Sequence, residues 1–421
     1  MVHDAAAAPP LRRLLDAAED ASPVQAVQAV TRELGAALQA TSVSFLIADL
    51  SGRALVRMAH QELQGDPADG VREHDEERAT VLPFDGGPAE QALRSQQVQV
   101  LPSGAGSWTV LAPVTERGEA LGLLEIELPR EPSDEVVGEV RRTAHVLAYV
   151  VIASRRHTDL YEWGQRSVPF SLSAEIQRRL LPAAYTCEAG SFTLAAWLEP
   201  ADTIGGDTFD YSLGRDLLHL SVTDAVGHGV DSALTATLCV GSLRNARRYG
   251  ASLLEQARAT NEALLANGAG PEGERFVTAL LGRLDLRTGD LALVNAGHTA
   301  PYLARDGRVE VVELPADLPL GLFPGGDYRS TTLPLAVGDR VVIVTDGMLE
   351  RAAASLDLAA HVRQTRGLHP REATRALADL VIDASGGVLA DDAALLVLDW
   401  HGDHGQPRRS VAGADTASPE A

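Results

Sequence analysis

The chain has 421 residues, of which 45% are hydrophobic and 22% are charged, so we expect a soluble protein of two or three domains. Its formal net charge of −22 argues against binding of nucleic acid or of an anionic membrane through bulk electrostatics. The sequence contains no lysine, which excludes lysine Schiff-base chemistry and a Walker-type phosphate loop.

Cysteine content and hydropathy further limit the class of protein that this sequence can encode. Cys187 and Cys239 are the only cysteines, and their spacing predicts neither a disulfide framework nor a cysteine zinc site. The first twenty residues carry early acids and lack an unbroken apolar core, so no secretory signal is expected. No apolar stretch approaches the length of a membrane span. We therefore expect a cytoplasmic protein that has no membrane partner.

The sequence pattern of the first half of the chain predicts a small α/β domain. In chain order, the patterns predict an N-terminal helical segment (1–20), a helix (23–40), a strand–turn–strand unit (42–59), an acidic loop (60–78) and a second pair of strands (107–129). This order over residues 21–152 resembles the GAF sensory fold. GAF domains bind small ligands or dimerise, and no haem or metal signature marks a ligand here.

A helical pattern follows from Ser133 to about Trp163, with apolar residues at spacings of three and four. After a break, Ser173 opens a second helix, 174–182, which Pro182 ends. Residues 153–184 are therefore assigned to a helical linker. An ordinary connection and a dimerising signal helix both remain open as interpretations, and we predict a homodimer through this helix.

The pattern changes beyond Pro182 to short apolar strands separated by turns. The predicted strands are 192–198, 217–223, 276–284, 291–294, 309–314, 341–345 and 393–399, and the predicted helices are 230–248, 251–266 and 369–384. Strands grouped at both ends, with helices between them, predict two sheets flanked by helices over residues 185–400. Residues 401–421 have no apolar periodicity and are expected to be disordered.

Acids recur at the ends of these predicted strands. Asp224 and Asp346 each end an apolar run as part of a Thr-Asp pair, Asp391 precedes another apolar run, and Asp207 follows two glycines that permit close backbone approach. One such aspartate is usually a cap or a turn residue. Four that converge would repel one another, and their oxygen-only ligation would favour Mg²⁺ or Mn²⁺. Two such ions could activate a water for attack on a phosphoryl group.

Several motifs carry a family resemblance over residues 174–400. They are "AEIQRRLLP" (174–182), "GGDTFDY" (205–211), "TDAVGHG" (223–229), "LDLRTGDLALVNAGHTAPYL" (284–303), "LPLGLF" (318–323), "VTDGMLE" (344–350) and "DDAALLVL" (391–398). Their order resembles the metal-dependent protein phosphatases (PPM, type 2C), in the bacterial branch with SpoIIE and RsbU. The resemblance implies an α+β chain: a GAF-like domain, a helical linker, and a β-sandwich flanked by helices (α-β-β-α).

The resemblance also implies a set of metal ligands for two Mn²⁺ or Mg²⁺ ions. Asp207 and Asp224 would be the central ligands, with help from the backbone carbonyl of Ala225. Asp346 and Asp391 would complete the second metal. The four aspartates are therefore the candidate catalytic residues.

Other residues of these motifs are assigned less sharply. Asn295 and His298 either lie near the site or shape a strand end and a turn, and the turn is the favoured interpretation. His228 is either a leaving-group acid or a turn residue. Asp210 and Asp392 are expected to support the ligands or to face solvent. We assign no arginine as a phosphate clamp.

The predicted function is hydrolysis of phosphoserine or phosphothreonine on a protein by a two-metal-activated water. The resemblance implies that the substrate is a phosphorylated antagonist of an anti-sigma factor, and that the GAF-like domain and the linker gate activity. The alternative is a catalytically weak protein that uses the phosphatase fold as a binding or scaffold module. Because all four acid sites are present, the sequence favours the enzyme.

Overall fold

The computed structural model describes residues 11–50, 52–62, 71–74, 77–104, 106–166, 170–199, 205–268, 275–349, 356–386, 389, 391–403 and 413–414. The chain divides into two compact units, Met1–Pro169 with Arg409–Ala417, and Phe170–Arg408 with Ser418–Ala421. The division falls inside the predicted linker, and the predicted domain boundaries stay predictions. None of the described helices is both long and apolar enough to cross a bilayer.

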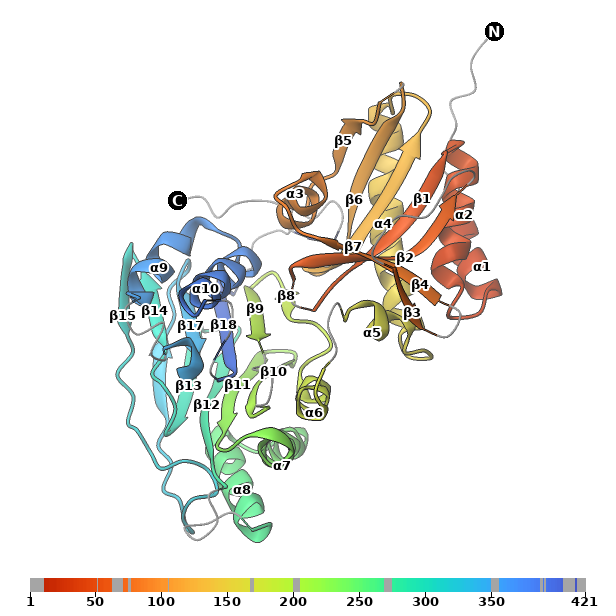
Figure 1. Cartoon of the computed structure of the whole chain (residues 1–421). Coiled ribbons are helices and arrows are strands. Elements are labelled where there is room, and N and C mark those ends of the chain that lie inside the picture. The colour runs from red at the N-terminus through yellow and green to blue at the C-terminus, as the bar shows by residue number, and fades with distance from the viewer. Residues whose placement is uncertain are drawn as a thin grey trace. The chain divides into compact units, whose positions relative to one another are not determined.

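The first unit is one antiparallel sheet with helices on both faces (Figure 1). The strands are β1 (Ser42–Ala48), β2 (Ala54–Glu62), β3 (Val71–His74), β4 (Glu77–Pro83), β5 (Gln99–Pro102), β6 (Trp108–Glu116) and β7 (Glu119–Leu128), in the order β3-β4-β2-β1-β7-β6-β5. The helices are α1 (Leu11–Asp20), α2 (Ala26–Leu38), α3 (Pro88–Ser95), α4 (Asp134–Ser154) and α5 (Leu160–Gly164).

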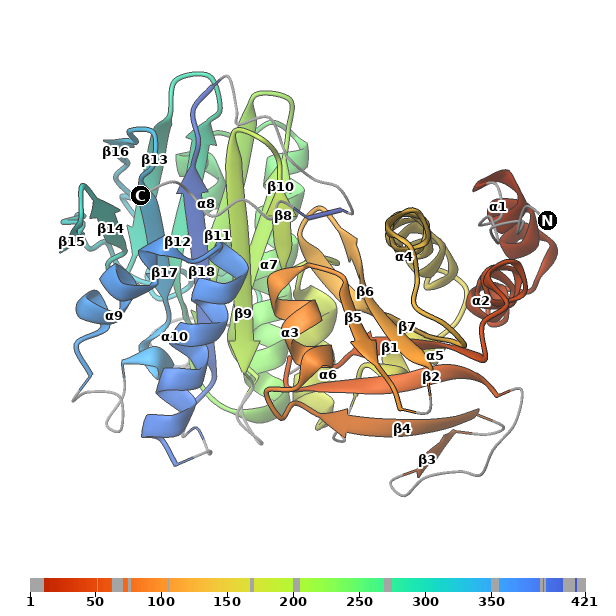
Figure 2. The same cartoon turned by 90° about the horizontal axis from the view of Figure 1, so that it is seen from above.

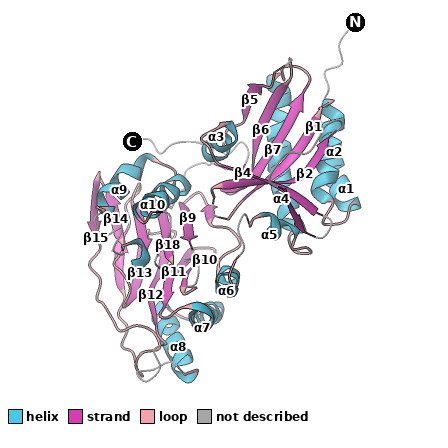
Figure 3. Ribbon diagram, in the orientation of Figure 1, coloured by secondary structure: helices cyan, strands magenta, loops and turns pink. Residues whose placement is uncertain are grey.

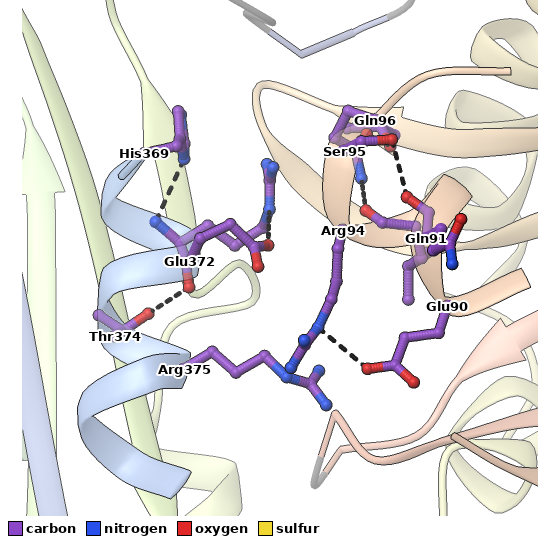
Figure 4. A network of polar contacts seen from close by, with 12 residues as sticks. Glu90, Gln91, Arg94, Ser95, Gln96, His369, Glu372, Thr374 and Arg375 are labelled. Atoms are coloured by element: carbon purple, nitrogen blue, oxygen red, sulfur yellow. Dashed lines mark hydrogen bonds and ion pairs between the residues drawn. The ribbon is translucent and has the colours of Figure 1, made fainter. Parts of the chain in front are cut away.

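The sheet of the first unit separates two cores because successive side chains point to opposite faces. Phe45 and Ile47 of β1 pack with α1, α2 and α4, whereas Leu46 packs with α3 on the other face. Ser133 caps α4, and within α3 Arg94 forms an ion pair with Glu90 (Figure 4). These features define an α/β unit, and its assignment as a GAF domain stays a prediction.

Part of the predicted first unit was wrong. The predicted acidic loop, 60–78, contains the end of β2, all of β3 and the first residues of β4; its residues 63–70 and 75–76 lie outside the described ranges. These mostly polar residues form strands because Thr80–Pro83 of β4 pair with β2, and β4 in turn pairs with β3. The long helical pattern after Ser133 also ends earlier than predicted, at Ser154, and α5 is a separate short helix.

The second unit consists of two antiparallel sheets packed face to face, with helices on both outer faces (Figure 2). Its strands are β8 (Thr186–Glu188), β9 (Phe192–Glu199), β10 (Asp207–Leu213), β11 (Leu217–Ala225), β12 (Val277–Asp285), β13 (Asp290–Ala296), β14 (Tyr302–Arg305), β15 (Arg308–Val311), β16 (Thr331–Pro334), β17 (Arg340–Val344) and β18 (Ala393–Trp400). The five-stranded sheet has the order β10-β11-β12-β13-β16, and the six-stranded sheet has the order β15-β14-β17-β18-β9-β8.

The helices of the second unit are α6 (Leu172–Leu180), α7 (Gly229–Arg248), α8 (Leu253–Ala266), α9 (Leu358–Gln364) and α10 (Pro370–Ala384), with 3₁₀ turns η1 (Asp346–Met348) and η3 (Thr365–Gly367). Helices α7 and α8 cover the five-stranded sheet, and α9 and α10 cover the six-stranded sheet. Figure 3 shows the resulting four layers. The predicted sandwich of two sheets flanked by helices is therefore confirmed.

Strand alternation builds the cores of this sandwich. Leu280 of β12 points inward between the sheets, whereas its neighbour Leu281 points outward against α7 and α8. Ile343 of β17 likewise points inward, and Val344 packs against α9 and α10. The edge strand β10 and the short strands β8, β14 and β16 were not predicted. The predicted disorder of residues 401–421 falls mostly outside the described residues.

Candidate active site

Two of the predicted ligands lie side by side on the five-stranded sheet. Asp207 begins β10 and pairs in register with Asp224, which lies near the end of β11. A side chain on Gly206 would overlap with the carbonyl oxygen of Ala225. Glycine at this position therefore allows the backbone before Asp207 to pack against the carbonyl that was predicted to be a ligand.

The other two predicted ligands belong to the six-stranded sheet. Asp346 begins η1 directly after β17, and Asp391 immediately precedes Asp392 and β18. Strands β17 and β18 are neighbours, and a side chain on Gly347 would overlap with the carbonyl oxygen of Asp392. The two segments that carry these acids are thus held in close backbone contact.

The electrostatics shows that the acids of the two sheets converge. Burial, followed by the charges of Asp224 and Asp392, raises the pKa of Asp207 well above its usual range, although a hydrogen bond from Thr345 opposes this shift. Burial raises the pKa of Asp224 to about 7, and the charges of Asp346, Asp391 and Asp392 add to the effect. Each sheet therefore places negative charge against the other at one end of the sandwich.

The oxygen atoms of these carboxylates are the kind of ligand that a divalent cation prefers. Within the described ranges, no group of three or more His, Cys, Asp or Glu side chains already has the arrangement of a metal site. The convergent groups are nevertheless all oxygen donors, and their repulsion would be relieved by Mg²⁺ or Mn²⁺. Asp207 and Asp392 are oriented by hydrogen bonds to protein groups.

Sequence reasoning missed Gln177, which connects α6 to the site. This side chain is 1% exposed, and its amide nitrogen lies 2.7 Å from both the carbonyl oxygen of Asp207 and a carboxylate oxygen of Asp392. Asp392 also accepts from the backbone N–H of Gly206 at 3.0 Å. A glutamine on the buried face of an amphipathic helix was the available signal. Asp392 is therefore a buried supporting acid and does not face solvent.

Thr345 is a second residue that the sequence reading passed over. Its hydroxyl donates to Asp207 Oδ2 at 2.6 Å and accepts from the backbone N–H of Ala394 at 2.9 Å. It thus connects the six-stranded sheet directly to a carboxylate of the five-stranded sheet. The repeated Thr-Asp pair was the signal, since Thr223 is also buried and bonds to Thr208 across the strands.

The remaining predicted positions fall into different settings. Asp210 is 4% exposed and forms ion pairs with Arg244 and Arg247 of α7, so it holds a helix and does not face solvent. His228 is exposed at the start of α7, where its side chain makes no capping hydrogen bond. Asn295 bonds to the backbone of His298, which confirms the predicted turn.

Comparisons with known proteins show which family the second unit is similar to. The family model described as "Stage II sporulation protein E (SpoIIE)" matches residues 214–401. "Phosphoserine phosphatase RsbU" of Bacillus subtilis is 20% identical over 233 residues, which cover 54% of this chain and 68% of RsbU. "Protein IcfG" of Synechocystis is 21% identical over 203 residues, 42% of this chain but only 32% of IcfG.

Among solved structures, the SiaA-PP2C domain of Pseudomonas aeruginosa is 24% identical, with a TM-score of 0.47; the match covers 54% of this chain and 94% of that domain. By the family model and the sequence relatives, the second unit is similar to SpoIIE-type phosphatases.

Proposed function

We propose that the chain is a metal-dependent serine/threonine protein phosphatase. The observation that carries this proposal is that acids of both sheets act on one carboxyl: burial raises the pKa of Asp224 to about 7, and the charges of Asp346 and Asp391 from the other sheet add to this effect. Asp207, Asp224 and the Ala225 carbonyl would hold one part of a two-cation site, and Asp346 and Asp391 the other. When bound, Mn²⁺ or Mg²⁺ would activate water and neutralise phosphoryl oxygens.

The chain's own residues would orient these ligands. Thr345 fixes one oxygen of Asp207, and Gln177 fixes the backbone of Asp207 together with the carboxylate of Asp392. The exposed carboxylate of Asp346 lies at the solvent side of the cluster, where a phosphorylated side chain could approach. Because a protein-bound phosphate is large and polar, an open site of this kind suits a phosphoprotein.

The substrate class is phosphoserine or phosphothreonine on a protein, and a phosphorylated antagonist of an anti-sigma factor is the specific substrate that we propose. The name of RsbU, a phosphoserine phosphatase, supports the residue type. A binding or scaffold role is the second candidate, because no ready-made metal cluster exists among the described side chains. A homodimer through the predicted linker helix, residues 153–184, also stays a prediction.

The decisive experiment measures phosphate release from an aryl phosphate and from a phosphoserine peptide, with and without Mn²⁺. Asp346→Asn should lower Mn²⁺-dependent turnover at least about 100-fold, since it removes a direct ligand. Asp290→Asn, which changes another exposed acid of the same unit, is the matched control. Mn²⁺ binding without turnover by the native chain would favour the binding module.

A further inference from the structure

The carboxylates of the site are divided between two sheets, so the spacing between the sheets controls whether they can share cations. Asp224 lies on the five-stranded sheet, and Asp346 follows a strand of the six-stranded sheet. The Thr345–Asp207 hydrogen bond is one direct connection between the two sheets. A second connection is made by the turn at residues 295–299, which follows β13.

This turn is fixed by its own side chains. Asn295 Oδ1 accepts from the backbone N–H of His298 at 2.7 Å, and Asn295 Nδ2 donates to the carbonyl oxygen of His298 at 3.0 Å. Gly297 has φ of +73°, and a side chain there would collide with Pro319. Asn295 and His298 are both buried, so the turn presents the imidazole in one orientation.

The turn contacts both sheets that carry predicted ligands. His298 Nδ1 lies 2.9 Å from Thr278 Oγ1, and Thr278 pairs directly with Asp224 across β11 and β12. The hydroxyl of the next residue, Thr299, donates to the carbonyl oxygen of Val344, two residues before Asp346. This turn is therefore hydrogen-bonded to Thr278, the strand partner of Asp224, and to β17, which precedes Asp346.

The imidazole itself is unusual for a residue with only a packing role. His298 is 8% exposed, and besides its contact with Thr278 the ring has a hydrogen bond with the backbone of Val344, which opposes the effect of burial on its pKa. Burial lowers the pKa of His298 to about 4, so the ring is neutral near pH 7. One of its nitrogens can then donate a hydrogen bond, and the other can accept one. The ring therefore contacts Thr278 of the five-stranded sheet and Val344 of the six-stranded sheet, which favours a role beyond packing.

We propose that His298 is a positioning residue: together with Thr278 and Thr299 it sets the separation of the two sheets at the site, and thereby the separation of Asp224 from Asp346 on which divalent-cation binding depends. This inference rests on the proposed function, because it concerns the same cation site. It assigns to the turn a role in metal affinity, whereas a merely structural turn would affect only folding.

The test is Mn²⁺ binding by titration calorimetry on the full chain, with unfolding temperature measured in parallel. His298→Leu should weaken Mn²⁺ binding about 10-fold or more, in the range found for residues that orient metal ligands. Thr278→Val should act similarly, and the double variant should lose no more than the stronger single variant, because both changes break one contact. His298→Asn keeps a polar group near the Nδ1 position and should recover most of the affinity.

His369→Leu is the matched control. His369 is largely buried in the same unit, burial lowers its pKa, and its Nδ1 accepts from the backbone N–H of Arg371 at 3.2 Å (Figure 4). It begins α10 and pairs with Glu188, so it contacts neither β12 nor β17 through these bonds. We expect its loss to lower the unfolding temperature while Mn²⁺ affinity stays within about 2-fold of the native value, because distant sites act independently.

Two results would overturn the inference while the proposed function survives. One is native Mn²⁺ affinity in His298→Leu; the other is an equal loss of affinity in His298→Leu and His369→Leu. If the native chain binds Mn²⁺ but hydrolyses no phosphate, the proposed function fails, and the affinities of the variants still decide the role of His298. A native chain that binds no Mn²⁺ would overturn both.

Discussion

Removal of the charge of Asp224 should stabilise the metal-free protein. Burial and the neighbouring acids raise the pKa of this carboxyl from 3.8 to about 7. Such a shift corresponds to about 4 kcal/mol of unfavourable free energy for the ionised folded form. Asp224→Asn keeps the size of the side chain and removes this cost.

Proton linkage gives the direction in which the stability contribution of Asp224 changes with pH. Because the folded-state pKa lies above the unfolded value, folded Asp224 binds more protons than the unfolded chain between about pH 4 and pH 7. Its relative contribution to stability is therefore greatest below this window and falls as the pH rises through it. Above about pH 7 the whole cost is present, so the variant should gain most there.

The assay is urea unfolding in EDTA at pH 5 and pH 8. At pH 8, Asp224→Asn should raise the free energy of unfolding by about 2–4 kcal/mol, and at pH 5 the gain should be smaller by about 2–3 kcal/mol. Asp231→Asn, at a carboxyl that is 75% exposed, should show no such difference between the two pH values. Mn²⁺ should stabilise the native chain and have much less effect on Asp224→Asn.

A gain for Asp224→Asn that is absent at pH 8, or equal at both pH values, would refute this reasoning. The first outcome would mean that the carboxyl ionises at little cost, so the acids would not be close in solution. The second would mean that the amide stabilises through packing and not through the loss of charge.

Three further predictions concern a residue beside the site, a buried ion pair and the first unit. Gln177→Leu should lower the free energy of unfolding by about 2–4 kcal/mol and reduce Mn²⁺-dependent turnover, because two buried acceptors lose a donor. The control, Arg179→Ala, lies on the exposed side of the same helix and should change neither quantity. Urea unfolding and phosphate release measure the two quantities. Arg340→Met should cost about 3–5 kcal/mol in urea unfolding, since it leaves the buried partner Asp399 uncompensated, and Arg340→Met/Asp399→Leu should recover part of the loss. A fragment of residues 170–403 should differ in turnover from the full chain if the first unit gates activity, and equal turnover per mole would argue against gating.

The sequence by itself determined most of the second unit. Short apolar runs predicted strands β9, β11, β12, β17 and β18, because each buries one face between the sheets and the other under helices. The Thr-Asp and Gly-Gly-Asp motifs indicated the acids that the structure brings together. Local chemistry was sufficient here, since an acid at the end of a buried strand is costly wherever it lies.

Tertiary structure alone decided the elements that depend on partners far along the chain. Strand β3 and the first residues of β4 are mostly polar. They form strands because β4 pairs with β2 and in turn pairs with β3. The sequence likewise could not show that Gln177 and Asp392 meet, because 215 residues separate them. The roles of Thr345 and His298 depend on the packing of one sheet against the other. Periodicity records which face of an element is buried, whereas only the packed fold determines which side chains meet across the buried face.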